Sequence, residues 1–172
     1  MTDAVIIGAL RSATGRFGGV LKDMPATVIG GKVLAATLAE TRIAASEVDE
    51  VIMGMVYQGG AGANPARQAA VHAGLPYEVP STTVNKLCGS GLKSVGLGAQ
   101  AIVAGEAEVV LAGGMENMSL APYVMPGARW GERLGHGQIE DMMLLDGLWD
   151  CFYDCHMGIT AENLAEEYGI SR

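Results

Sequence analysis

A cysteine on a glycine-flanked turn is the feature of this sequence best suited to chemistry. Cys88 follows Ser81–Leu87, which has the composition of a short strand, and it precedes Gly89 and Gly91. Apolar and small residues then recur at spacings of three and four, which indicates one face of a helix: Leu92, Val95, Gly96, Ala99, Ile102 and Val103. The pattern predicts that Cys88 lies on a turn between a strand and a helix.

That position favours nucleophilic chemistry. The N-terminus of a helix carries roughly half a positive charge, which favours a thiolate over a thiol. Backbone N–H groups of the turn can bind an oxyanion, and Gly89 and Gly91 have no side chains to obstruct a substrate. A cysteine that attacks an acyl carbon needs these features. The alternative is that Cys88 is a small buried hydrophobic residue, and spacing alone leaves both interpretations open.

Four stretches resemble one protein family. Residues 85–94 (Asn-Lys-Leu-Cys-Gly-Ser-Gly-Leu-Lys-Ser) are similar to the nucleophile motif of thiolases, the acetyl-CoA acetyltransferase family. The stretches 64–70 (Asn-Pro-Ala-Arg-Gln-Ala-Ala), 113–119 (Gly-Gly-Met-Glu-Asn-Met-Ser) and 156–163 (His-Met-Gly-Ile-Thr-Ala-Glu-Asn) resemble the same family, in its order. The likeness runs from residue 4 to residue 172. It implies an acyl-thioester intermediate on Cys88, acetyl-CoA and coenzyme A as substrates, no permanently bound cofactor, and a role in fatty acid metabolism.

The resemblance also implies an architecture and a binding site. The expected fold is a layered α/β/α arrangement, of which this chain would be the N-terminal half of a pseudo-two-fold pair. Residues 1–119 are expected to form the core domain that carries the nucleophile, and residues 120–172 the start of a loop domain that covers the active site. By the same resemblance Leu148 and Met157 line the tunnel for the pantetheine arm of the substrate, with His156 as their polar neighbour.

The order of the predicted elements supports an α/β fold independently. Apolar runs of strand length occur at 4–9, 51–56, 81–87 and 109–112. A helix with an apolar row at Val28, Ile29, Val33 and Ala36 is expected at 26–41, and Asn64 can cap a helix that Pro65 begins. This β-α-β-α-β-α-β order predicts a largely parallel sheet with helices on both faces. Ligands bind such sheets near the carboxyl ends of the strands, where Cys88 is expected.

The pattern changes after Ser119. Residues 120–137 have no clear period, and a segment of that kind is usually functional or bound to a partner. Together with the family's habit of pairing subunits, this predicts a homo-oligomer, either a dimer or a tetramer. Residues 140–154 are expected to form an acidic surface helix with an apolar underside, and residues 156–168 a helix capped by Thr160.

Composition excludes several classes of function. Apolar residues make up 49% of the chain and charged residues 17%, which predicts much buried surface in this chain or against a partner. The net charge of −8 argues against nucleic acid as a partner. Because coenzyme A is anionic, any phosphate-binding patch must be local or come from residues outside this sequence. No apolar run approaches the length of about 20 residues that a membrane span needs, and a cytoplasmic location is expected.

Other readings of single residues are weaker. Cys151, Cys155 and His156 have no second ligand pair nearby in the sequence, so a metal site is not expected. His72 could act as a base, but a surface histidine is the favoured interpretation.

Two alternatives remain for the whole chain. A ketoacyl synthase also places a cysteine at a helix N-terminus, although the stretches 113–119 and 156–163 favour a thiolase. The chain could instead be an inert fragment, or a half-subunit that needs a second chain. We expect the C-terminal half of a thiolase to accompany it, as a second polypeptide or a further segment. That half would supply the histidine, the asparagine that orders a water, and the second cysteine of the family mechanism.

Overall fold

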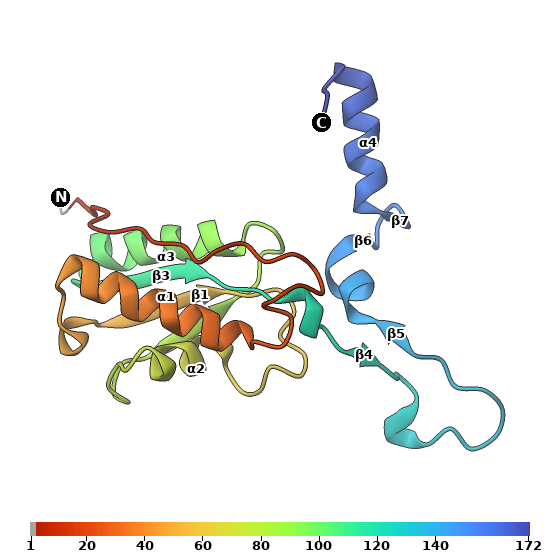
Figure 1. Cartoon of the computed structure of the whole chain (residues 1–172), viewed down its shortest axis with the longest axis horizontal. Coiled ribbons are helices and arrows are strands. Elements are labelled where there is room, and N and C mark those ends of the chain that lie inside the picture. The colour runs from red at the N-terminus through yellow and green to blue at the C-terminus, as the bar shows by residue number, and fades with distance from the viewer. Residues whose placement is uncertain (1–2) are drawn as a thin grey trace. The chain divides into compact units, whose positions relative to one another are not determined.

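The computed structural model describes residues 3–172, which divide into two compact units, one that ends at Leu120 and one that spans Ala121–Arg172. The first unit is a three-layered α/β/α arrangement around a parallel sheet (Figure 1). The sheet has the strand order β2-β1-β3, from β1 (Glu50–Gly54), β2 (Ser81–Val84) and β3 (Val110–Gly114). The predicted α/β fold with a parallel sheet and helices on both faces is therefore confirmed.

The helices join the strands by crossovers and cover both faces of the sheet. Helices α1 (Ala26–Thr41) and α2 (Pro65–His72) pack against each other on one face, and α3 (Ser90–Ala104) packs on the other (Figure 1). Short 3-10 turns at Ala45–Glu47 and Met118–Leu120 lie before β1 and after β3. The predicted start of α2 is confirmed, because Pro65 is its first residue and the Asn64 side chain accepts the Arg67 N–H at 3.2 Å.

Small residues lie at the closest contacts on the buried faces of the helices. In α1 the fully buried residues are Ala26, Thr27, Gly30, Gly31, Leu34 and Leu38. The predicted row is not this face, since Val28, Ile29 and Val33 are only partly buried and Ala36 is exposed. A Cβ on Gly31 would fall 2.5 Å from the His72 Cβ, which shows how closely α1 and α2 approach. Close packing of two backbones needs small side chains, so glycines lie where α1 contacts α2.

Helix α3 follows the same rule. Its buried residues are Ser90, Ser94 and Gly98, whereas Leu92 is 80% exposed and Val103 is 57% exposed. The six residues of the predicted apolar row therefore do not form the buried face. The Ser94 hydroxyl, which is fully buried, lies 2.6 Å from both the Gly91 and the Gly113 carbonyl oxygens, and this ties the helix to β3.

The turn before α3 and the helix itself also contain an apolar window. Leu87–Ala104 has the length and composition of a membrane span, with a mean hydropathy of 1.2 over 18 residues, of which 22% are buried. The expectation that no run approaches that length is therefore wrong for this segment. The finding is weak, because a helix that packs against a sheet in a folded core passes the same test.

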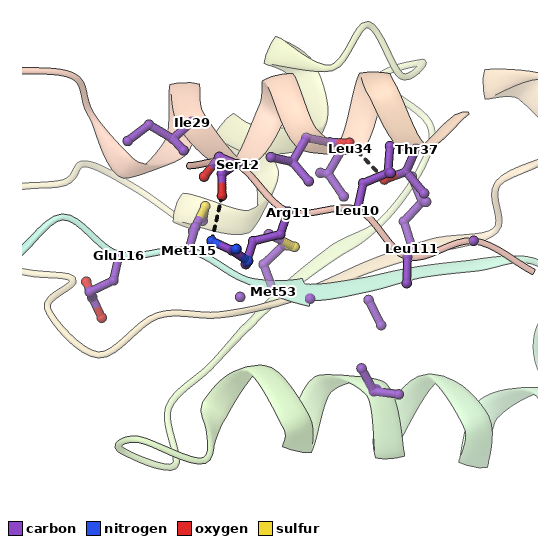
Figure 2. A pocket seen from close by; sticks show the side chains of 18 of the residues that line it. Leu10, Arg11, Ser12, Ile29, Leu34, Thr37, Met53, Leu111, Met115 and Glu116 are labelled. Atoms are coloured by element: carbon purple, nitrogen blue, oxygen red, sulfur yellow. Dashed lines mark hydrogen bonds between the residues drawn. The ribbon is translucent and has the colours of Figure 1, made fainter. Parts of the chain in front are cut away.

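The predicted strand at 4–9 is wrong. Among the described residues this segment forms no ladder hydrogen bonds, and Val5, Ile6 and Ile7 are exposed. A strand requires ladder hydrogen bonds to a neighbour, and in the described structure the 4–9 segment forms none with the free edge of β3. A largely apolar cavity of about 790 Å³ is lined by the segment, α1, β3 and α3. Figure 2 shows Leu10, Arg11 and Ser12 on the segment, with α1 on one side and Leu111 of β3 on the other.

The second unit consists of short elements. They are β4 (Tyr123–Val124), a 3-10 turn (Ala128–Trp130), β5 (Glu140–Asp141), a π-helical turn (Leu144–Leu148), β6 (Trp149–Asp150), β7 (Cys155–His156) and α4 (Met157–Tyr168). Strands β4 and β5 pair antiparallel, as do β6 and β7. Met142 and Gly147 are its only buried residues.

Two predictions for this unit are wrong. The acidic helix expected at 140–154 is instead the series from β5 through the π-helical turn to β6, because Asp141 and Asp150 accept backbone N–H groups two residues ahead and thereby form turns. Helix α4 is present, but its cap is His156 rather than Thr160. The His156 Nδ1 accepts the Gly158 N–H at 2.9 Å.

Candidate active site

Cys88 lies on the turn between β2 and α3, two residues before the first residue of α3. The turn is held by its own side chains. Asn85 Oδ1 accepts the Leu87 N–H at 2.9 Å, and the Ser90 hydroxyl accepts the Lys86 N–H at 2.8 Å while it donates to the Leu87 carbonyl at 2.6 Å. These bonds fix the backbone of Lys86 and Leu87, directly before Cys88.

The backbone of this turn is strained. Leu87 adopts a left-handed conformation with φ of 48°, which costs about 1–2 kcal/mol for a residue with a Cβ. The Asn85 and Ser90 side chains offset that cost, because they bond to the same residue. A left-handed residue directly before Cys88 turns the chain sharply, so that the thiol stands at the end of the strand.

The Cys88 thiol is free and exposed. It is therefore not the small buried residue of the alternative interpretation. Cys151 is also free and exposed, and Cys155 is free and partly buried, so exposure alone does not single out Cys88. Of the three cysteines, all in the described part of the chain, only Cys88 is both exposed and next to the N-terminus of a helix.

Glycines allow the start of α3 to approach the ends of two strands. A Cβ on Gly54 of β1 would lie 2.5 Å from the Ser90 carbonyl carbon, and a Cβ on Gly114 of β3 would lie 3.1 Å from the Gly91 Cα. Gly54 and Gly114 therefore allow the close packing of α3 on the sheet, whereas a Cβ on Gly91 would lie 3.5 Å from the Gly114 Cα, an ordinary contact distance. Gly89 caps α3.

Two adjacent side chains after β3 hold the surrounding loops. Glu116 Oε2 accepts the Val56 N–H at 2.7 Å, and both carboxylate oxygens lie 3.4 Å from the Tyr57 nitrogen. Asn117 Nδ2 donates to the carbonyls of Leu21 and Met24 at 2.9 and 2.8 Å. Glu116 and Asn117 therefore fix the segment after β1 and the segment before α1.

Glu116 and Asn117 lie in the stretch 113–119, which carries the family resemblance, but neither was predicted to have a role of its own. A signal was present, since a carboxylate that directly follows a buried parallel strand lies at the edge where ligands bind. Burial raises the pKa of the Glu116 carboxyl above its ordinary value, and the hydrogen bonds from the Val56 and Tyr57 N–H groups lower it by less.

The β6–β7 pairing brings together the three residues predicted to bind the pantetheine arm. Trp149 pairs with His156, so Leu148, which precedes Trp149, and Met157, which follows His156, lie at the same end of this ribbon. All three side chains are partly buried. Because His156 Nδ1 accepts an N–H, the neutral ring carries its hydrogen on Nε2, which is left to donate. The binding role of these residues stays a prediction.

The other candidate residues of the sequence belong to other elements than the turn before α3. His72 lies on α2, on the face of the sheet opposite α3, and Cys155 lies in β7 while Cys151 is in the turn before it. Within residues 3–172 no cluster of three or more histidine, cysteine, aspartate or glutamate side chains could hold a metal ion. The 790 Å³ cavity of Figure 2 includes Glu116 and Arg11 but not Cys88.

Comparison with known proteins identifies the family. The model of the thiolase N-terminal domain matches residues 4–172. The chain is 60% identical over 172 residues to the acetyl-CoA acetyltransferase of Pseudomonas aeruginosa, 56% identical to that of Cupriavidus necator and 54% identical to a probable acetyl-CoA acyltransferase of Staphylococcus aureus. In each case all of this chain and 44% of the relative are covered, so the chain spans less than half the length of these curated relatives. The chain belongs to the thiolase family and corresponds to its N-terminal domain.

Proposed function

We propose that the protein containing this chain transfers acyl groups between thioesters of coenzyme A through an acyl-enzyme on Cys88. The observation that carries the proposal is the free, exposed Cys88 thiol on a turn that leads into α3, within a match to the thiolase N-terminal domain. The names of the relatives from Pseudomonas aeruginosa and Cupriavidus necator make acetyl-CoA the proposed acyl donor.

The proposed reaction has two halves. In the first, the Cys88 thiolate attacks the thioester carbonyl carbon of acetyl-CoA, a new C–S bond forms to Cys88, and the bond to the coenzyme A sulfur breaks. Coenzyme A leaves and takes up one proton. The negative charge on the carbonyl oxygen is held by backbone N–H groups of the turn, including that of Cys88.

In the second half, a base removes the α-proton of a second acetyl-CoA. The resulting enolate carbon attacks the acetyl group on Cys88, the C–S bond to Cys88 breaks, and acetoacetyl-CoA and the Cys88 thiolate are released. The reverse sequence cleaves a 3-ketoacyl-CoA with coenzyme A. Because the family match covers residues 4–172, it favours this thiolase chemistry over the ketoacyl-synthase alternative.

Leu148, His156 and Met157 are proposed to receive the pantetheine arm. Their common position at one end of the β6–β7 ribbon supports the proposal, because a flexible arm is bound by an apolar wall with few polar groups. The Nε2–H of His156 is the polar group that this ribbon would offer to the arm.

The bases of both halves are proposed to come from outside residues 1–172. His72 is on the opposite face of the sheet from α3, His136 is on an exposed loop, and His156 caps α4. None of them matches the family's catalytic histidine. The remaining 56% of the curated relatives is the proposed source, present as a further segment or as a second polypeptide. Proton transfer is required for both acylation and enolate formation.

Acylation of the complete protein tests the proposal directly. Incubation with acetyl-CoA is expected to add the mass of one acetyl group, located on Cys88 by peptide mapping. The Cys88→Ala variant should gain none, and Cys151→Ala should be acetylated like the wild type. Acetylation that persists in Cys88→Ala would refute the acyl-enzyme. Residues 1–172 alone should show little thiolysis of acetoacetyl-CoA, and turnover comparable to that of the complete protein would refute the external bases.

A further inference from the structure

Glu116 continues the hydrogen-bonding pattern of the sheet beyond the ends of its strands. The Met55 N–H bonds to the Val84 carbonyl at 3.0 Å, and the Met115 N–H bonds to the Gly54 carbonyl at 3.0 Å. The next N–H group along the chain after that of Met55 is the Val56 N–H, and its acceptor is not a backbone carbonyl. The Val56 N–H is bound instead by Glu116 Oε2 at 2.7 Å, which makes the carboxylate a substitute for a strand carbonyl.

The bound segment lies beside the Cys88 turn. Val56 follows β1, and β1 pairs with β2 in a register that aligns Gly54 with Val84. Asn85 Nδ2 donates to the Val56 carbonyl at 3.4 Å, and Asn85 Oδ1 accepts the Leu87 N–H at 2.9 Å. One continuous series of hydrogen bonds therefore runs from Glu116 through Val56 and Asn85 to the residue that precedes Cys88.

The Glu116 carboxyl is partly desolvated where it bonds to the segment after β1. Glu116 is exposed as a whole, but loss of water around its carboxyl raises the pKa of that group, and the Val56 and Tyr57 N–H groups lower it by less. Bonds to an ionised acceptor are about twice as strong as those between neutral groups, which suits an anchor for a loop that must not move.

We propose that Glu116 is a positioning residue for the nucleophile, and that its carboxylate fixes the Val56–Tyr57 segment against which Asn85 holds the Leu87–Cys88 turn. Glu116 acts through Val56 and Asn85 and does not touch the substrate. The catalytic part of this inference rests on the proposed acyl transfer at Cys88. The positioning of the Cys88 thiol itself can be measured without a substrate.

The first experiment measures the second-order rate at which iodoacetamide labels Cys88 in the complete protein. Glu116→Gln keeps the size of the side chain and one acceptor oxygen but removes the charge, and Glu116→Asp keeps the charge on a shorter side chain. Glu106→Gln is the matched control, because Glu106 is exposed after α3 and forms no side-chain bond in the described structure. We expect about tenfold slower labelling for Glu116→Gln, the loss typical of one charge-assisted hydrogen bond, and an unchanged rate for Glu106→Gln.

Partial rescue and steady-state kinetics separate positioning from general stability. Glu116→Asp is expected to lie between Glu116→Gln and the wild type. In thiolysis, Glu116→Gln should lower kcat with little change in KM, because Glu116 is not among the residues proposed to bind the substrate arm. A wild-type labelling rate in Glu116→Gln, or a raised KM with kcat unchanged, would overturn the proposal. If Glu116→Gln does not fold, a wild-type labelling rate in Glu116→Asp overturns it instead.

Failure of the proposed function gives a different result. If the wild type is not acetylated at Cys88 by acetyl-CoA, the acyl-transfer proposal is wrong, while the iodoacetamide comparison still decides whether Glu116 positions the thiol. If the wild type is acetylated and Glu116→Gln is acetylated as fast as Glu106→Gln, the acyl transfer stands and the role of Glu116 is refuted.

Discussion

Gly54 and Ser90 are packed so closely that no side chain fits between them. A Cβ on Gly54 would fall 2.5 Å from the Ser90 carbonyl carbon and 2.6 Å from the Gly91 nitrogen. The end of β1 therefore fixes the distance of the first turn of α3 from the sheet. It also fixes the position of Cys88, which lies two residues before the first residue of α3. The Ser90 hydroxyl, which bonds to Lys86 and Leu87, transmits this contact to the cysteine turn.

Gly54→Ala is expected to destabilise the protein by about 1–3 kcal/mol, because the new methyl group meets backbone atoms that cannot rotate away. It should also slow iodoacetamide labelling of Cys88. Gly96→Ala is the control on α3, since a Cβ there meets no other atom and alanine stabilises a helix by roughly 0.5–1 kcal/mol relative to glycine. Thermal unfolding of the complete protein measures the stability of both variants. Equal unfolding midpoints for Gly54→Ala and Gly96→Ala would contradict the prediction.

Cys88 is expected to be the first cysteine to react with iodoacetamide. Cys88 and Cys151 are both exposed, so any preference between them must come from the helix N-terminus next to Cys88. Peptide mapping after limited labelling of the complete protein should find most of the label on Cys88. Equal labelling of Cys151 would mean that exposure alone controls the reaction.

Met157→Ala is expected to raise KM for acyl-CoA by about tenfold, which corresponds to the loss of one apolar side chain from a binding surface. Alanine favours a helix at least as well as methionine, so α4 should keep its stability. Ile159→Ala is the control, because Ile159 lies on the same helix and is exposed. The same change in KM for both variants would show that Met157 has no specific part in binding the pantetheine arm.

Asp49 links acid stability to the start of β3. Its Oδ2 accepts the Glu108 N–H at 2.7 Å and the Val109 N–H at 2.9 Å, and the N–H groups of Val109 and Glu108 lower the pKa of the Asp49 carboxyl. A carboxylate with a lowered folded-state pKa stabilises the fold above its unfolded value of about 3.9, and this contribution is lost as the pH falls through the folded value.

Asp49→Asn should therefore lower the thermal midpoint at neutral pH, and the difference from the wild type should shrink below about pH 4. Unfolding curves between neutral and acidic pH measure this difference. A difference that grows on acidification would show that the sign is wrong.

The complete protein is expected to sediment as a dimer or a tetramer. The second unit exposes large apolar side chains, among them Trp130, Leu134 and Phe152, and exposed groups of this kind commonly mark protein contacts. Sedimentation velocity at micromolar concentration measures the state. Trp130→Ala should shift it toward smaller species, whereas a monomeric wild type would refute the prediction.

The sequence predicted the elements that depend on local signals. The Asn64 cap, the start of α2 at Pro65 and the strands around 51–56 and 109–112 all follow from residue type and short-range pattern, and the structure contains them. The position of Cys88 between a strand and a helix followed in the same way. Turn chemistry and apolar runs operate within a few residues and need no knowledge of the rest of the fold.

Features that depend on distant partners were not predicted. The 4–9 run has strand composition, but a strand also needs ladder hydrogen bonds to a neighbour, and this run forms none with the free edge of β3 in the described structure. The buried faces of α1 and α3 contain Gly31 and Ser94. Gly31 lets α1 approach α2 closely, and Ser94 bonds to the Gly113 carbonyl of β3, so neither residue is buried because it is hydrophobic. Glu116 was overlooked because its partners, Val56 and Tyr57, are about 60 residues away in the sequence.

The free side of β3 has a consequence for handling the protein. Residues 109–114, Val-Val-Leu-Ala-Gly-Gly, carry no charged side chain, and β3 forms the outer strand of its sheet in the described structure. An uncharged strand edge of this kind is a template on which a strand from another molecule can add. Preparations limited to these 172 residues should consequently tend toward intermolecular strand addition and precipitation as their concentration rises.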